Sequence, residues 1–203
     1  GAPMARADGV PKVTGADRFG DDAAPADALW LRAVRSPHAR ARFSLGDLAA
    51  AKRRHAGLVD ILTAADVPGE NSFGIYPHLK DQPVFAEGFV RYRGEAVLAL
   101  VGTRAAVDAA AGDAALVTWY AEEPVLGLAA ALARGAPAIH ASHADNVLAQ
   151  GHLEKGAVEP AIAAAAVVAE GELETSYVEH AYIEPEAGYA RRIGADGERI
   201  EVV

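Results

Sequence analysis

The sequence has no cysteine among its 203 residues. Disulfides, thiolate zinc sites, cysteine nucleophiles and cysteine-ligated iron–sulfur clusters are therefore excluded from this chain. Long apolar runs are also missing, because the most apolar stretches, such as residues 161–169, are far shorter than the ~20 residues of a membrane helix. The N-terminal residues show no apolar core of a signal peptide. We therefore expect a cytoplasmic protein without a membrane partner.

Positive charge is also scarce. Lys and Arg number 19 against 28 Asp and Glu, which gives a net charge of −9. Such a balance disfavours binding to a phosphate backbone. The one basic run, residues 52–55, falls at the end of a predicted helix, where positive side chains complement the helix dipole. We therefore expect no nucleic-acid partner.

Most motifs that carry catalytic chemistry are absent. The sequence contains no G-x-S-x-G elbow, no Walker loop, no G-x-G-x-x-G and no H-E-x-x-H. His140 and His143 could lie on one face of a turn, but a metal site needs three or four donors and only Asp145 is close in sequence. A surface or capping role is therefore favoured for both histidines. We predict neither catalytic nor metal-ligating residues in this chain.

The pattern of apolar residues predicts alternating strands and helices. Hydrophobic residues make up 51% of the chain, which is enough for a buried core. Strands are predicted over residues 29–34, 42–45, 58–62, 90–92, 96–101 and 116–120. Helices are predicted over residues 48–55, after an Asp47 cap, and over 104–115, with a single turn at 63–67. This alternation indicates an α/β or α+β layered fold.

Several connecting segments stand out. Residues 1–27 are predicted to be extended, residues 84–86 to resume regular structure, and the strands at 90–92 and 96–101 to flank a tight turn at Gly94. Residues 68–83 form a long loop rich in Gly and Pro, and such a loop is more often functional than idle.

A second unit is predicted after a loop at residues 137–146. It contains a weak helix at 158–166, a long strand at 167–177 with a bulge at Gly171, and a hairpin of residues 189–193 and 199–203. Because the last strand is apolar and ends the sequence, we expect a continuation that pairs with it. The polar stretch 179–186 could be a surface turn, a site or a subunit contact.

Eight segments, in order, resemble the molybdopterin-binding subunit of the xanthine dehydrogenase/aldehyde oxidase family of molybdenum hydroxylases. They are residues 12–19 (KVTGADRF), 35–41 (RSPHARA), 57–69 (GLVDILTAADVPG), 83–86 (PVFA), 90–97 (VRYRGEAV), the Ala-rich stretch after Thr103, 118–120 (TWY) and 180–187 (HAYIEPEA). The form of the last segment is similar to that of bacterial xanthine dehydrogenases. One departure is Glu95, which stands where many members have Gln or His.

The resemblance implies an α/β (α+β) hammerhead domain over residues 16–142, after an N-terminal arm at 1–15. Residues 143–203 would then begin a molybdopterin-binding domain. The whole enzyme would hydroxylate a purine, another N-heterocycle or an aldehyde with oxygen from water. It would use molybdenum–molybdopterin in this subunit, with iron–sulfur clusters and FAD on partner domains or subunits. The catalytic residues would lie beyond this chain, so the isolated chain is expected to be an inactive scaffold that binds no molybdenum.

The resemblance also suggests positions of interest. Tyr76, His78 and Leu79 are predicted to line the substrate funnel. Gly94, Glu95, His180 and Glu184 are candidates for contacts with the cofactor domain or with an interface. Two alternatives remain: a stand-alone, non-catalytic hammerhead interaction module, and a small-molecule binding protein that uses loop 68–83.

Overall fold

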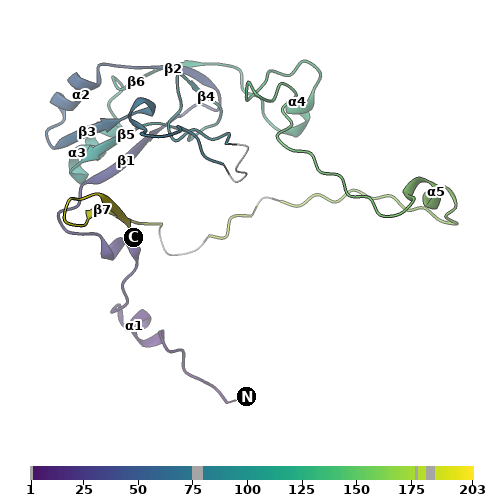
Figure 1. Cartoon of the computed structure of the whole chain (residues 1–203), viewed down its shortest axis with the longest axis horizontal. Coiled ribbons are helices and arrows are strands. Elements are labelled where there is room, and N and C mark those ends of the chain that lie inside the picture. The colour runs from purple at the N-terminus through teal and green to yellow at the C-terminus, as the bar shows by residue number, and fades with distance from the viewer. Residues whose placement is uncertain (1, 75–79, 177, 182–185) are drawn as a thin grey trace. The chain divides into compact units, whose positions relative to one another are not determined.

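The computed structural model describes residues 2–74, 80–176, 178–181 and 186–203. The chain divides into two units, labelled by their elements in Figure 1. We call Leu29–Glu154 the central unit, and Gly1–Ala28 together with Lys155–Val203 the terminal unit. Within the described residues, no helix is both long and apolar enough to cross a membrane.

Two three-stranded sheets form the central unit. In the first, β5 (Ala96–Gly102) lies between β1 (Trp30–Arg35) and β3 (Leu58–Leu62). In the second, β2 (Ala41–Leu45) lies between β4 (Phe89–Val90) and β6 (Val117–Ala121). Every pairing is antiparallel, so the layered fold that the sequence predicts is of the α+β kind.

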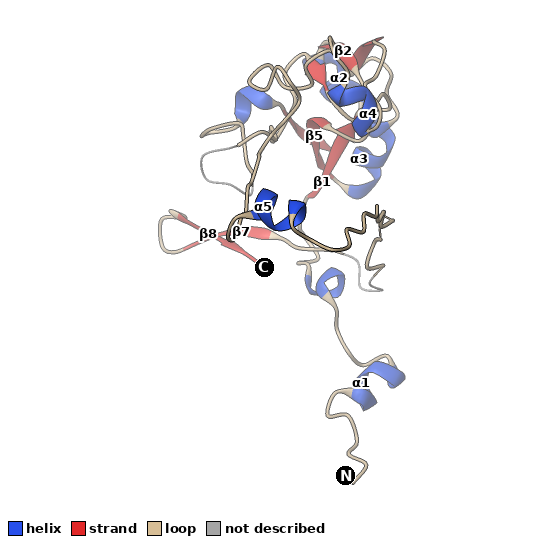
Figure 2. Cartoon of the chain, turned by 90° about the vertical axis from the view of Figure 1, so that its right-hand side faces the viewer, coloured by secondary structure: helices blue, strands red, loops and turns tan. Residues whose placement is uncertain are grey.

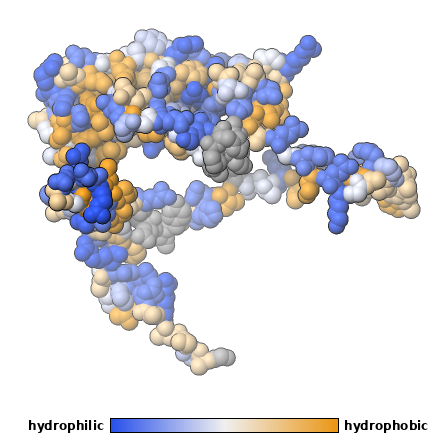
Figure 3. All heavy atoms as spheres, in the orientation of Figure 1, coloured by the Kyte–Doolittle hydropathy of each residue, from blue (hydrophilic) through white to orange (hydrophobic). Residues whose placement is uncertain are grey.

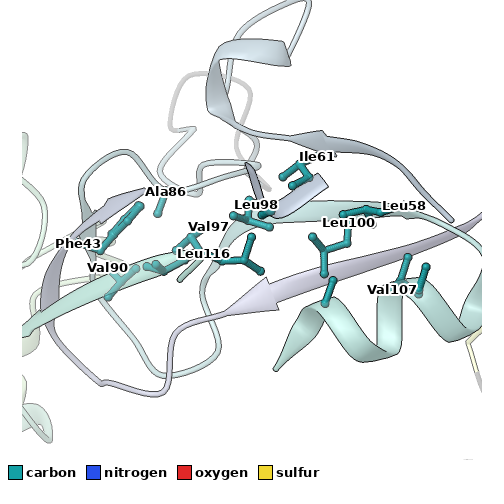
Figure 4. Packing of buried hydrophobic residues seen from close by; sticks show 14 of the residues in the cluster. Phe43, Leu58, Ile61, Ala86, Val90, Val97, Leu98, Leu100, Val107 and Leu116 are labelled. Atoms are coloured by element: carbon teal, nitrogen blue, oxygen red, sulfur yellow. The ribbon is translucent and has the colours of Figure 1, made fainter. Parts of the chain in front are cut away.

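The apolar core is centred on β5. Residues 97–100 are all at most 1% exposed, which means that both faces of this strand are covered. Helix α3 (Arg104–Ala111) packs against β1, β5 and β3 and buries Ala106, Val107 and Ala110 (Figure 2). Side chains from both sheets, among them Phe43 of β2 and Leu98 of β5, belong to one cluster (Figure 4).

Local features of the sequence, such as caps and turn residues, predicted most of these elements correctly. Helix α2 (Leu48–Arg54) begins where the Asp47 carboxylate accepts the Ala50 N–H at 2.8 Å, as predicted. The 3₁₀ turn η2 (Ala64–Asp66) confirms the single turn expected at 63–67. Helix α3 is shorter than predicted, because Asp113 folds residues 112–116 into a turn by accepting the Ala115 N–H.

Strands β4 and β5 flank a turn at Gly94, as predicted, but they belong to different sheets, since β4 pairs with β2 whereas β5 pairs with β1 and β3. One expectation for the central unit was wrong. Residues 84–86 contain bends and no strand, although Ala86 is buried and its N–H donates to the Ala96 carbonyl. The short helix α4 (Leu128–Leu132) was not predicted.

The terminal unit contains short elements. The predicted extended arm instead includes α1 (Gly9–Thr14) and the 3₁₀ turn η1 (Gly20–Ala23). Helix α1 ends at Gly15, whose φ of 73° suits glycine, and Lys12 bonds the Asp17 carboxylate at 2.7 Å. These local contacts explain why the arm is not extended throughout.

The C-terminal part of the terminal unit confirms two predictions and overturns one. Helix α5 (Val158–Ala163) lies within the predicted helix, and β7 (Ala190–Ile193) pairs with β8 (Arg199–Val202) as the predicted hairpin. Residues 167–176, however, form no strand. Their pattern suits a strand, but an extended segment becomes one only when a neighbour pairs with it, and no described residue does so.

Candidate functional site

Two of the resembling segments meet where the chain passes from β4 to β5. The Ser36 N–H donates to the Glu95 carbonyl at 2.9 Å, and the Gly94 N–H donates to the Ser36 carbonyl at 2.8 Å. We call this group, with Arg91 included, the junction. It links the end of β1 to the turn that leads into β5, so it lies where the two sheets are connected. Gly94 adopts a φ of 98°, which a side chain would disfavour.

Glu95 is the most deeply buried charged group of the described residues, at 1% exposure. One carboxylate oxygen accepts the Arg91 backbone N–H at 2.5 Å, and the other lies 3.4 Å from Arg91 Nη1. A buried carboxylate needs such partners, because an unpaired charge is costly away from water. Both contacts fall within its own turn, so the Glu95 carboxylate stabilises the junction.

Arg91 continues the junction into a stack of charged and aromatic side chains. Its guanidinium lies 5.8 Å from the Phe89 ring centre, and that of Arg40 lies 5.1 Å from the same centre. Glu122 bonds Arg40 at 3.1 Å and Arg42 at 3.0 Å. The stack thereby ties β4 to β2 and to the residue that follows β6.

The R-S-P-H segment has a local explanation as well. Ser36 is 3% exposed, and its Oγ accepts the His38 N–H at 3.0 Å and donates to the His38 carbonyl at 2.8 Å. The His38 ring packs edge-on against Trp119 of β6, with 5.8 Å between the ring centres. These residues therefore shape a turn, and the arrangement gives them a structural role.

His140 is close enough to the junction to experience its charges. Burial lowers the pKa of His140, the positive Arg91 lowers it further, and Asp81 and Glu95 oppose the effect. His143 lies with Nδ1 2.8 Å from Ser142 Oγ. Over the described stretches, no group of three His, Cys, Asp or Glu side chains is arranged to hold a metal ion.

The funnel candidates Tyr76, His78 and Leu79 lie outside the described residues. The stem of their loop is fastened by Asn71, which the sequence reasoning missed. Its amide donates to the Phe85 carbonyl at 2.8 Å and accepts the Phe85 N–H at 3.0 Å, as a paired strand residue would. Phe73 and Gln82 form a two-residue β-bridge further along the stem. The only sequence signal for this role of Asn71 was the position of an Asn at the start of a Gly-rich loop.

The remaining candidates belong to the terminal unit. His180 is exposed in a segment without regular structure, and Glu184 lies outside the described residues. The candidates Gly94 and Glu95 are adjacent in the chain and lie together at the junction, whereas His180 belongs to the other unit. A shallow groove of about 380 Å³ in the central unit is lined by β2, η2, β5 and residues 86–88, and includes none of the predicted site residues.

Among the described candidates, the buried Glu95 carboxylate bonds Arg91 within its own turn and is not open to a molybdenum–pterin cofactor. His180 is exposed, and no three His, Cys, Asp or Glu side chains of the described residues are arranged to hold a metal ion. We therefore derive no catalytic step through that cofactor on this chain.

Two family models match the chain. Residues 14–124 match "Aldehyde oxidase and xanthine dehydrogenase, a/b hammerhead domain", and residues 139–202 match "Molybdopterin cofactor-binding domain". The chain is 31% identical to the nicotinate dehydrogenase large molybdopterin subunit of Eubacterium barkeri, over 93% of this chain and 43% of that protein. It is 32% identical to a probable xanthine dehydrogenase subunit of Bacillus subtilis, over 91% of this chain and 24% of that protein. The chain thus spans less than half the length of these relatives.

Solved structures agree with these matches. The aldehyde oxidoreductase from Desulfovibrio gigas superposes with a TM-score of 0.80 at 26% identity, over 97% of this chain and 22% of that one. Quinoline 2-oxidoreductase from Pseudomonas putida 86 superposes with a TM-score of 0.79 at 26% identity, over 98% of this chain and 26% of that one. The chain therefore belongs to the aldehyde oxidase and xanthine dehydrogenase family, whose a/b hammerhead domain it carries.

Proposed function

We propose that this chain is the N-terminal part of the molybdenum cofactor-binding subunit of a xanthine dehydrogenase/aldehyde oxidase-type hydroxylase. In this proposal the hammerhead domain covers residues 16–142, after the arm at 1–15, and residues 143–203 begin the cofactor-binding domain. The chain acts as a scaffold, and the catalytic residues belong to the remainder of the subunit. The cofactor would supply the redox chemistry that adds a water-derived oxygen to a heterocycle or an aldehyde.

The observation that carries the proposal is that residues 167–176 and 178–181 belong to no described strand. Val167, Leu173 and Val178 are 85%, 90% and 78% exposed, and no described strand pairs with their backbone. Apolar groups at the α5 end of this part of the chain also lie on the surface (Figure 3). Exposed apolar side chains along one segment without a paired neighbour are typical of a surface that another polypeptide covers. The match of residues 139–202 to the cofactor-binding domain supports the remainder of that domain as the cover.

The site residues follow from this assignment. Gly94 and Glu95 would fix the shape of the hammerhead domain at the junction, while His180 and Glu184 would contact the rest of the cofactor domain. Tyr76, His78 and Leu79 remain the proposed wall of the substrate funnel. In the assembled enzyme, Leu79→Ala and His78→Ala should raise KM without loss of molybdenum, and unchanged kinetics across several substrates would remove them from the funnel.

Complementation tests the assignment directly. The chain is produced alone, and also together with the remaining part of the same subunit and with its iron–sulfur and FAD partners. We expect stoichiometric molybdenum and oxidation of a heterocycle or aldehyde only in the assembled sample. Stoichiometric molybdenum on the chain alone would refute the proposal. A chain that associates with none of these parts would favour the stand-alone interaction module.

A further inference from the structure

The turn that carries the junction ends in an exposed, positively charged tip. Tyr92 is 50% exposed, and Arg93 beside it is also exposed. The Arg35 guanidinium reaches the same turn, where Nη1 donates to the Gly94 carbonyl at 2.9 Å. We call Arg35, Tyr92 and Arg93 the tip. It places two guanidinium groups and one aromatic ring on a single turn.

The charges of the tip are not neutralised within the described chain. Most other arginines of the central unit form ion pairs with carboxylates, namely Arg32, Arg40, Arg42, Arg54, Arg91 and Arg104. Arg35 and Arg93 form no ion pair with any residue that the structure describes. In a chain of net charge −9, two exposed arginines at one turn that form no ion pair with a described residue are a distinct local feature.

Hydrogen bonds also fix the backbone of the turn that carries the tip. The Glu95 carboxylate bonds the Arg91 N–H, the Glu95 N–H donates to the Tyr92 carbonyl at 3.3 Å, and the backbone of Ser36 pairs with both Gly94 and Glu95. Because the backbone of this turn is already ordered, binding costs only the rotamer freedom of the tip side chains and not that of the backbone. Tyr and Arg are the residue types that most often dominate the energy of protein interfaces.

We propose that the tip is a contact point for an acidic surface on another subunit of the assembled enzyme. Guanidinium groups bind carboxylates in paired geometry, which selects an acidic partner. The net negative charge of the chain disfavours nucleic acid as that partner. The relatives are named as subunits, so further subunits are available to supply the carboxylates. This inference rests on the proposed function.

The test measures assembly of the purified molybdenum-binding subunit, reconstituted to full length, with its iron–sulfur and FAD subunits. Arg35→Glu and Arg93→Glu are compared with wild type and with Arg53→Glu, a control on α2 that reverses another exposed arginine without an ion pair. We expect the dissociation constant to rise at least tenfold for each tip variant and to stay within twofold for the control. Higher salt should weaken wild-type assembly more than that of Arg93→Glu.

Arg93→Gln provides a milder variant in case charge reversal disturbs folding, and it should still weaken assembly severalfold. If the wild-type enzyme assembles and both Arg93→Gln and Arg35→Glu assemble with unchanged affinity, the tip is not a contact and this inference fails while the proposed function stands. If wild-type subunit neither assembles nor binds molybdenum, the proposed function and the inference fail together.

Discussion

The central and terminal units contain similar kinds of residues but use them differently. In the central unit, Leu98 and Leu100 are completely buried between two sheets and a helix. In the terminal unit, Leu173, Ile200 and Val202 are between 70% and 90% exposed. Apolar residues therefore do not make a core by themselves, because even paired strands such as β7 and β8 need a second layer against which their apolar side chains can pack. The central unit supplies that second layer within its own sequence, whereas the described residues of the terminal unit do not.

The largest effect should come from truncating the core of the central unit. Leu100→Ala removes a completely buried side chain on β5, and we expect the free energy of unfolding to fall by about 2–5 kcal/mol. Urea denaturation of the 203-residue chain, followed by Trp fluorescence, measures the change. A loss below about 1 kcal/mol would mean that the core is not centred on β5.

A smaller effect is expected at the junction. Glu95→Gln keeps an oxygen for the Arg91 N–H but removes the charge that balances the Arg91 guanidinium. The free energy of unfolding should fall by about 1–3 kcal/mol. Glu123→Gln, on an exposed residue, is the matched control and should change stability little. Equal stability of the two variants would show that the buried carboxylate does not hold the junction.

The ion pair between Asp113 and Arg54 of α2 should contribute less to the free energy of unfolding. Its contribution should also depend on pH. The Arg54 guanidinium 2.6 Å away, the Ala115 N–H and the His55 ring hold the pKa of Asp113 well below its usual range. A carboxyl group whose pKa is lowered by folding stabilises the protein above its unfolded pKa and loses that contribution as the pH falls. Asp113→Asn should therefore cost about 1 kcal/mol at pH 7.

Thermal unfolding across a pH series checks whether the stabilisation by Asp113 is lost, as expected, when the pH falls. The difference between wild type and Asp113→Asn should shrink as the pH drops below about 4, where the unfolded carboxyl group takes up its proton. Asp27→Asn in the terminal unit serves as the control. A difference that grows at low pH would contradict the assigned pKa direction.

The smallest effect on the isolated chain should come from Leu173→Ala. This side chain is 90% exposed, so its removal should change the free energy of unfolding by less than about 0.5 kcal/mol. In the assembled subunit the same change should weaken association of residues 1–203 with the remainder, because the side chain would then be buried. Association as strong as in wild type would show that this residue is not covered.

How far the sequence predicts this fold depends on how local the signal is. The Asp47 cap, the turn at 63–67 and the hairpin around residues 194–198 rest on neighbouring residues, and all were predicted. The assignment of β4 and β5 to different sheets depends on pairing with β2 and β1, which periodicity does not encode. The strand predicted at 167–177 failed for a related reason, since no strand among the described residues pairs with residues 167–176.

The candidate site shows the same difference between features that depend on neighbouring residues and contacts that form only on folding. The resemblance identified Gly94 and Glu95, yet the hydrogen bonds of both residues to the Ser36 backbone form only in the folded chain. Asn146 was read only as part of a loop, although with a φ of 59° it bonds the Ile139 N–H and the carbonyls of Ala131 and Pro137. Contacts of this kind cannot be predicted from spacing alone.

Hydrogen–deuterium exchange of residues 167–176 tests the central claim most directly, because it reports whether the unpaired segment gains a partner. The exchange is measured on the 203-residue chain alone and on its complex with the remaining part of the subunit, with β5 as the internal reference. We expect the amides of 167–176 to exchange almost freely in the isolated chain and to be slowed at least a hundredfold in the complex, while β5 is protected in both. Strong protection of 167–176 in the isolated chain, or free exchange in a complex that contains molybdenum, would contradict the account.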